Sequence, residues 1–255
     1  MRGRQIFYVI ISIIQMFSAT QCARGLTYQE TYQEVTYQEL AYEELAYEDC
    51  PQGKVVALTF DDGPGPYTDA LLDILSERGA KATFFLIGNR VTPETAPLVA
   101  RMTNEGHSVG SHTFSHTRLT LLSNRDIQLE LEKTDNAIKN VVGITPYLVR
   151  PPFGSYDDRV VMAINRPVIL WSLDTIDWKL NDAETVKENI TKHVKDGDVI
   201  LLHELKQSSL DGVAAAMDTL LKEGYTFVTV PELFSQRGIE LTAGMHYHDA
   251  CDIGH

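Results

Sequence analysis

Two adjacent carboxylates follow the first strongly apolar run of the chain. Asp61 and Asp62 come directly after Val55–Phe60, a short stretch typical of a buried β-strand. Two carboxylates at one strand end can do different work, because one can bind a cation while the other accepts a proton. Residues 62–64, Asp-Gly-Pro, are also typical of a turn, so this segment alone predicts a turn as readily as a catalytic site.

Two histidines lie four residues apart after a later apolar run. At this spacing His112 and His116 would share one face of a helix and could chelate one metal ion. A histidine pair on its own more often lies on the surface without a function or forms part of the core. Together with Asp62, the pair would form a two-histidine, one-carboxylate site with open positions for water, as expected of a hydrolytic metal centre.

Three further polar clusters follow apolar runs. Arg150 begins the sequence Arg-Pro-Pro-Phe-Gly and offers a fixed cation on a backbone stiffened by proline. Asp174–Trp178 places acids beside a large aromatic ring, and His203 ends the apolar run 199–202. Each cluster also has a structural explanation: Arg150 as a surface ion pair, Trp178 as a core residue and His203 as a helix start. Their shared position at strand ends favours a catalytic site.

The elements that must position these residues alternate between short apolar runs and amphipathic segments from Lys54 onward. We expect strands at 55–60, 82–87, 108–111, 147–150, 168–172, 199–202 and 226–230, and helices at 67–78, 95–105, 124–142, 157–165, 182–194 and 212–223. This alternation predicts an α/β domain with about seven mostly parallel strands, closed like a barrel. An open doubly wound sheet is the alternative, but no glycine-rich dinucleotide-binding loop follows the first strand.

Composition and the N-terminal residues predict the setting in which this domain works. The 255 residues carry a net charge of −13 and no sustained basic run, so we expect no nucleic-acid partner.

Residues 1–23 are interpreted as a cleaved secretory signal, because their apolar stretch is too short to cross a bilayer. Residues 24–49 form an acidic Tyr-Gln-Glu repeat, which predicts a disordered spacer. Residues 50–255 would be the catalytic domain of a secreted, extracellular or cell-wall-associated monomer, without stable membrane insertion after signal cleavage.

The polar clusters, in this order, resemble the motifs of the polysaccharide deacetylase family of carbohydrate esterases. The resemblance covers about residues 50–238; Thr59–Pro64 matches the first motif without change, and His112–His116 matches the second. It implies a distorted (β/α) barrel of the deacetylase type. It also implies a secreted metal-dependent hydrolase that removes N-acetyl groups from the N-acetylglucosamine units of chitin or chitooligosaccharides and releases acetate. Two alternatives stay open: a wall-associated homologue that binds carbohydrate with weak or no activity, and an unrelated metal-dependent amidase or esterase.

The resemblance implies a role for each proton-transfer group. Asp61 would be the catalytic base, and Arg150 would orient it. His203 would be the catalytic acid, oriented by Asp177 or, as the less favoured choice, by Asp174. The physical reason is that an amine anion is a poor leaving group, so the departing nitrogen must receive a proton.

The metal and substrate contacts also come from the resemblance. One divalent ion, with zinc as first choice and cobalt as an alternative, would be held by Asp62, His112 and His116. The polysaccharide or oligosaccharide substrate would contact the backbone N–H of Phe153 and an acetyl pocket lined by Trp178 and Leu201.

The cysteines predict one disulfide bond. Cys22 leaves with the signal peptide or lies at its edge, so Cys50 and Cys251 remain in the mature chain. An even pair in a secreted protein suggests a bridge, and barrel-like folds bring their first and last elements together. The alternative is two free thiols on frayed ends.

Overall fold

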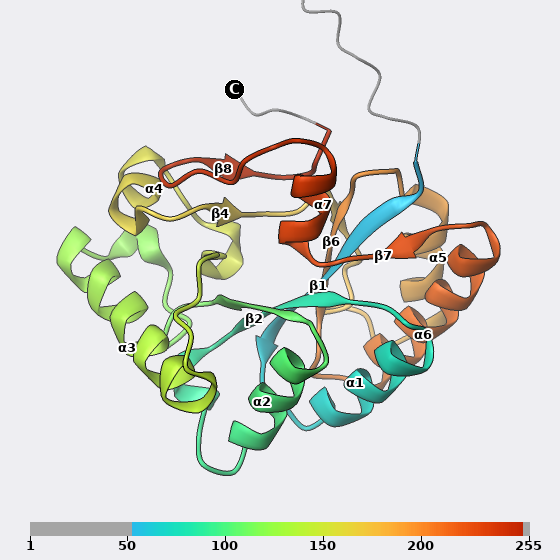
Figure 1. Ribbon diagram of the computed structural model, residues 1–255, viewed down its shortest axis with the longest axis horizontal. Coiled ribbons are helices and arrows are strands. Elements are labelled where there is room, and N and C mark those ends of the chain that lie inside the picture. The colour runs from blue at the N-terminus through green and yellow to red at the C-terminus, as the bar shows by residue number, and fades with distance from the viewer. Residues whose placement is uncertain (1–52, 252–255) are drawn as a thin grey trace, which may run out of the picture. The chain divides into compact units, whose positions relative to one another are not determined.

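The structure is a computed structural model that describes residues 53–251. The predicted signal peptide (1–23), the predicted spacer (24–49) and Cys50 lie outside the described residues. Within the described part, the helices surround a set of parallel strands (Figure 1). None of these helices combines the length and apolar character that crossing a bilayer requires.

Strand β1 (Val55–Gly63) lies at the centre of the sheet. The strand order is β3 (Ser108–Ser111), β2 (Ala82–Leu86), β1, β6 (Val199–His203), β5 (Leu173–Asp174), and β7 (Thr226–Phe227) pairs with the start of β1. These strands read as continuous apolar runs because a parallel sheet is covered on both faces. Their register places Asp61 of β1 directly beside His203 of β6. Two of the predicted catalytic groups therefore share one edge of the sheet.

Short contacts close the sheet into a distorted barrel. Val149 makes single parallel bridges with Ser111 of β3 and Val168 of β4 (Val168–Ile169). β4 also pairs with β8 (His246–Tyr247). The segment that follows β4 in the chain is β5, which pairs with β6. The expected strand 147–150 is thus reduced to the two bridges of Val149, and the expected strand 168–172 to the two residues of β4. Prolines next to both segments explain this, because proline cannot donate to a strand ladder.

The helices follow the expected order, with two differences. They are α1 (Thr68–Glu77), α2 (Ala96–Asn104), α3 (Asn124–Val142), α4 (Asp158–Ile164), α5 (Ala183–His193), α6 (Gln207–Lys222) and α7 (Val230–Gln236). α6 begins five residues before the expected start at Gly212. The expected strand 226–230 ends at Phe227, since Thr229 and Glu232 form a capping box that starts α7.

Alternation along β1 divides its side chains between the core and the site. Val56, Leu58 and Phe60 pack into the cluster shared with α1, α2 and α6. Thr59 and Asp61 point the other way, into the barrel, where both contact Arg150. The fold therefore holds the last residues of β1 on a rigid, fully packed strand.

Candidate active site

A cavity of about 520 Å³ opens at the carboxyl ends of β1, β5 and β6. The predicted site residues that line it are Asp61, Asp62, His112, His116, Phe153, Trp178, Leu201 and His203. Arg150 and Asp177 lie behind its wall, fully buried, in contact with Asp61 and His203. The structure thus brings all the residues that the motifs singled out into one place.

Three of these residues could hold a metal ion. Asp62, His112 and His116 each offer a ligand atom within 4.8 Å of the others. The Nε2 atoms of His116 and His112 lie 3.1 and 3.6 Å from Asp62 Oδ1, which is buried and without a hydrogen-bond partner among the described residues. A buried carboxylate oxygen facing two imidazole nitrogens is a donor set that fits a divalent cation.

The protonation of these groups also suits a metal site. Burial raises the pKa of Asp62, but the nearby His116 and His112 outweigh it and hold the pKa at about 2. Burial lowers the pKa of His112, which favours its neutral imidazole. His112 Nδ1 lies 2.7 Å from the carbonyl oxygen of Arg150, so Nδ1 carries the proton and Nε2 presents its lone pair to the cavity.

The helical explanation for the histidine pair is wrong. Residues 112–118 form a loop in which Thr113 and His116 have left-handed backbone angles (φ 65° and 58°). This reversal, and not a helix turn, brings the two imidazole rings to a centroid distance of 5.0 Å. The residues were correctly predicted to meet, although the local geometry that unites them is different.

Arg150 holds Asp61 in a fixed orientation. Its guanidinium donates to Asp61 Oδ1 at 2.8 Å, to Thr59 Oγ1 at 2.7 Å, and to the carbonyls of Ile169 and Leu170 at 3.0 and 2.6 Å. Arg150 is fully buried, and burial lowers its pKa while the charge of Asp61 opposes this. These hydrogen bonds hold the buried guanidinium in place, and the guanidinium in turn fixes the orientation of the Asp61 carboxylate. The alternative explanation of Arg150 as a surface ion pair is wrong.

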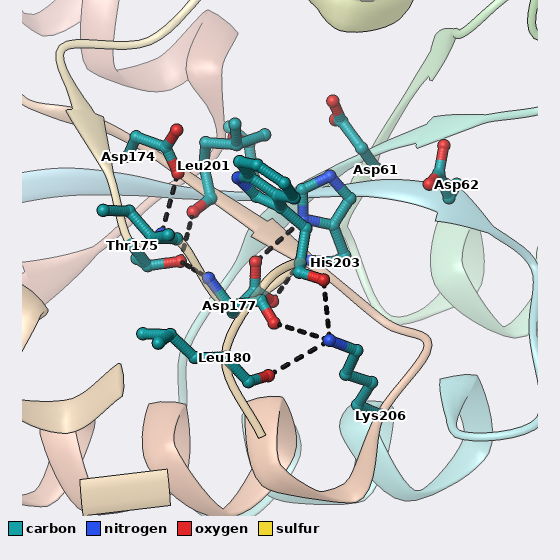
Figure 2. Close-up of polar contacts among 12 residues, drawn as sticks. Asp61, Asp62, Asp174, Thr175, Asp177, Leu180, Leu201, His203 and Lys206 are labelled. Carbon is teal, nitrogen blue, oxygen red and sulfur yellow. Dashed lines mark hydrogen bonds and ion pairs between the residues drawn. The ribbon is translucent and has the colours of Figure 1, made fainter. Parts of the chain in front are cut away.

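His203 is held by Asp177 and not by Asp174. Its Nδ1 lies 2.8 Å from Asp177 Oδ1, and its backbone N–H donates to Asp177 Oδ2 at 2.8 Å (Figure 2). Asp174 Oδ1 instead accepts the backbone N–H of Ile176. Burial lowers the pKa of His203, but the hydrogen bond and charge of Asp177 outweigh it and raise the pKa. A histidine with this partner can carry a proton that it later releases.

Aromatic side chains form the exposed rim of the cavity. Phe153 is 58% exposed, and its ring contacts His116 at a centroid distance of 4.7 Å. Trp178 is 54% exposed, whereas Leu201 is buried at the floor. Rings left exposed around a polar cavity supply flat apolar surface to a ligand. This is the chemistry expected of a contact with sugar rings or an acetyl methyl group.

Trp171 and Lys206 are among the lining residues that the sequence analysis did not predict. Trp171 lies near the end of the expected strand 168–172; a Cβ at Gly154 would approach its ring to 2.6 Å, so this loop needs glycine. Lys206 precedes α6, and its ammonium donates to three backbone carbonyls of the loop that carries Asp177. A single lysine beside a helix start gives no sequence signal for such a contact.

Glu204, directly after His203, is a buried acid beside the site. Its carboxyl group occupies the space that a Cβ at Gly63 would need, which explains glycine at that position. Thr68 donates a hydrogen bond to Oε2, and Oε1 has no partner among the described residues. Burial raises the pKa of Glu204 to about 8, so this carboxyl group is protonated at neutral pH.

Comparison with known proteins places the chain among polysaccharide deacetylases. Residues 48–166 match the family of polysaccharide deacetylases. The peptidoglycan-N-acetylglucosamine deacetylase PgdA of Listeria monocytogenes is 36% identical over 200 residues, which are 78% of this chain and 42% of that protein. The solved structure of T48 deacetylase with substrate is 41% identical, with a TM-score of 0.74, and the match covers 78% of this chain and 98% of that one.

A second solved structure carries a metal. The family 4 acetyl xylan esterase from Clostridium thermocellum in complex with a cobalt ion is 32% identical, with a TM-score of 0.73, and covers 77% of this chain and 98% of that one. The match to the Listeria protein extends over less than half of its length. The chain belongs to the polysaccharide deacetylase family.

Proposed function

We propose that this protein is a secreted, metal-dependent hydrolase that removes N-acetyl groups from N-acetylglucosamine units of a polysaccharide and releases acetate. One observation carries the proposal. The possible metal ligands Asp62, His112 and His116 line the same cavity as two groups that could transfer protons, Asp61 and His203. Each of these two groups is held by its own buried partner: Arg150 contacts Asp61, and Asp177 contacts His203. Metal-assisted hydrolysis of an amide uses a metal ion, a general base and a general acid, whereas binding of a carbohydrate needs none of the three.

The polymer is proposed from the substrates named for the relatives. Chitin or chitooligosaccharide was expected from the motifs, whereas the similar Listeria enzyme is named for peptidoglycan N-acetylglucosamine. Both polymers present the same N-acetyl group on the same sugar. We therefore take peptidoglycan glycan strands as the first substrate to test and chitin oligomers as the second, with the acetyl xylan of the Clostridium esterase as the oxygen-ester comparison.

The metal ion, with zinc as first choice and cobalt as the alternative, would be held by Asp62, His112 and His116, and would polarise the acetyl carbonyl and favour ionisation of water. Asp61, fixed by Arg150, would accept the proton of the attacking water. The N–H of Phe153 would donate to the oxyanion that forms at the carbonyl.

His203 completes the reaction by giving its proton to the departing amine nitrogen. Asp177 keeps the imidazole ring in place and stabilises its charged form through the 2.8 Å contact to Nδ1, which leaves Nε2 to face the cavity. The C–N bond then breaks to give acetate and a free glucosamine amine. Trp178 and Leu201, which line the same cavity, would receive the acetyl methyl group.

Acetate release and metal content, measured on the same samples, test this proposal. Purified protein should contain one divalent ion and release acetate from at least one acetylated glycan. Asp61→Asn should keep the ion and lose turnover by about 100-fold or more, because an amide cannot accept the proton. His116→Ala should lose the ion, while replacement of the exposed His193 of α5 by alanine should change neither quantity. Glycan binding without acetate release, with the ion in place, would show a carbohydrate-binding homologue instead.

A further inference from the structure

The side chain of Lys206 ends in a cage of backbone oxygens beside the active site. Its Nζ donates to the carbonyls of Asp177 at 3.1 Å, Trp178 at 2.7 Å and Leu180 at 3.1 Å (Figure 2). An ammonium group has three N–H donors, and all three are used here. Lys206 therefore does not offer its charge to a ligand, although it lines the cavity.

A lysine at position 206 does not stabilise helix α6. Lys206 is the N-cap residue of α6 and makes no capping hydrogen bond with its side chain. A cation at a helix N-terminus is disfavoured, because it faces the positive end of the helix dipole. The contact with the neighbouring loop accounts for a lysine at this position, and the helix does not.

The loop that Lys206 holds, residues 175–180, carries two site residues. Its first part is anchored where Thr175 Oγ1 donates to the Leu201 carbonyl and Asn189 donates to the Thr175 carbonyl, both at 2.9 Å. Ile176 then adopts a left-handed backbone angle (φ 58°), which is strained for a β-branched residue. Such a conformation persists only when contacts on both sides hold it, and Lys206 supplies contacts after Ile176.

Asp177 has contacts on opposite sides with Lys206 and His203. Its carbonyl oxygen faces the ammonium of Lys206, while its carboxylate receives the backbone N–H and faces the Nδ1 of His203. The carboxylate is fully buried, so its position depends on the backbone that carries it. A shift of the loop would move the carboxylate away from the imidazole that donates the leaving-group proton.

We propose that Lys206 is a positioning residue for proton donation: it fixes the loop 175–180 so that Asp177 keeps His203 aligned with the departing nitrogen. This inference rests on the deacetylase function proposed above. It predicts a dependence on the leaving group. In amide hydrolysis the C–N bond breaks only as nitrogen receives the His203 proton, whereas a 4-nitrophenyl ester releases a stable phenolate that needs no proton.

The test compares Lys206→Met with wild type on an N-acetylglucosamine oligomer and on 4-nitrophenyl acetate. We expect kcat on the oligomer to fall about 10–100-fold with a smaller change in KM, and hydrolysis of the aryl ester to change less than about 3-fold. Lys206→Arg, which keeps the charge and several donors, should recover most of the loss. Lys179→Met removes an exposed charge from the same loop and should behave as wild type on both substrates.

A double variant separates positioning from a general loss of structure. If Lys206 acts through Asp177, then adding Lys206→Met to Asp177→Asn should cost less than about 2-fold further on the oligomer. Equal losses on amide and ester, or independent multiplying losses in the double variant, would overturn the proposal. A wild-type enzyme that cleaves the ester but no glycan amide would overturn the deacetylase function itself, and this inference with it. Thermal unfolding of each variant shows whether it is folded, and Lys206→Gln replaces the methionine variant if that one is not.

Discussion

Replacing Glu204 with glutamine should remove a pH dependence of stability that the buried acid causes. The carboxyl group has no exposed surface, and burial raises its pKa from 4.5 to about 8. Between these two values the folded protein keeps a proton that the unfolded chain has released. The free energy of unfolding therefore falls as the pH rises, by about 1.4 kcal/mol per pH unit from this group alone.

The size of the effect follows from the window between the two pKa values. The stabilising contribution of Glu204 is complete below about pH 4.5 and is lost as the pH rises toward 8. Between pH 5 and pH 7 the loss amounts to about 2–3 kcal/mol. Glutamine has nearly the same shape and does not titrate, so the variant should lack this slope and should gain stability over wild type as the pH rises.

Urea unfolding followed by circular dichroism at pH 5, 6, 7 and 8 measures the difference directly. The comparison with wild type is needed because other groups titrate in the same range; burial lowers the pKa of His107 to about 4, which acts in the opposite direction below pH 6.5. Glu132→Gln, a change at an exposed position of α3, should reproduce the wild-type slope. Parallel curves for wild type and the Glu204 variant would refute the reasoning, because they would mean that Glu204 is ionised in the folded protein.

Two further predictions concern the buried ion pair and the predicted disulfide. Arg150→Met leaves the carboxylate of Asp61 buried without its cation, which should lower the free energy of unfolding by about 3–5 kcal/mol; thermal unfolding checks this, and adding Asp61→Asn should restore part of the loss. A bridge between Cys50 and Cys251 should leave no titratable thiol in the denatured, non-reduced mature chain, and two thiols by a chromogenic reagent would contradict it.

The sequence predicted which residues meet because parallel strands place their carboxyl ends at one edge. Asp61 and His203 end adjacent strands in register, so two apolar runs followed by polar residues were sufficient to bring them together. The strands β1, β2 and β6 were predicted correctly, because a strand that is covered on both faces appears in the sequence as a continuous apolar run.

The loops could not be predicted in the same way. The histidine spacing is compatible with a helix, but the left-handed angles of Thr113 and His116 replace it with a reversal that no spacing rule detects. Asp174 and Asp177 lie three residues apart in one loop, and only the contacts to His203 show which of them supports it. α7 was missed because the β-branched residues of 226–230 favour a strand, while the capping residues that start the helix come at the end of that run.

The left-handed residues described at the site have a consequence for how this protein could be stabilised. Among residues 53–251, the non-glycine residues with positive φ are Asp62, Thr113, His116, Phe153, Asn165 and Ile176. Asn165 ends a helix, Asp62 lies near the end of β1 at the site, and the other four lie in the site loops. At about 1 kcal/mol each, their combined strain is comparable to the net stability of a typical domain. Glycine at these positions would relieve strain while removing a ligand, a rim aromatic or a loop constraint. Selection for heat resistance alone would therefore favour sequences with an impaired site, and stabilising substitutions that preserve the site must lie elsewhere in the fold.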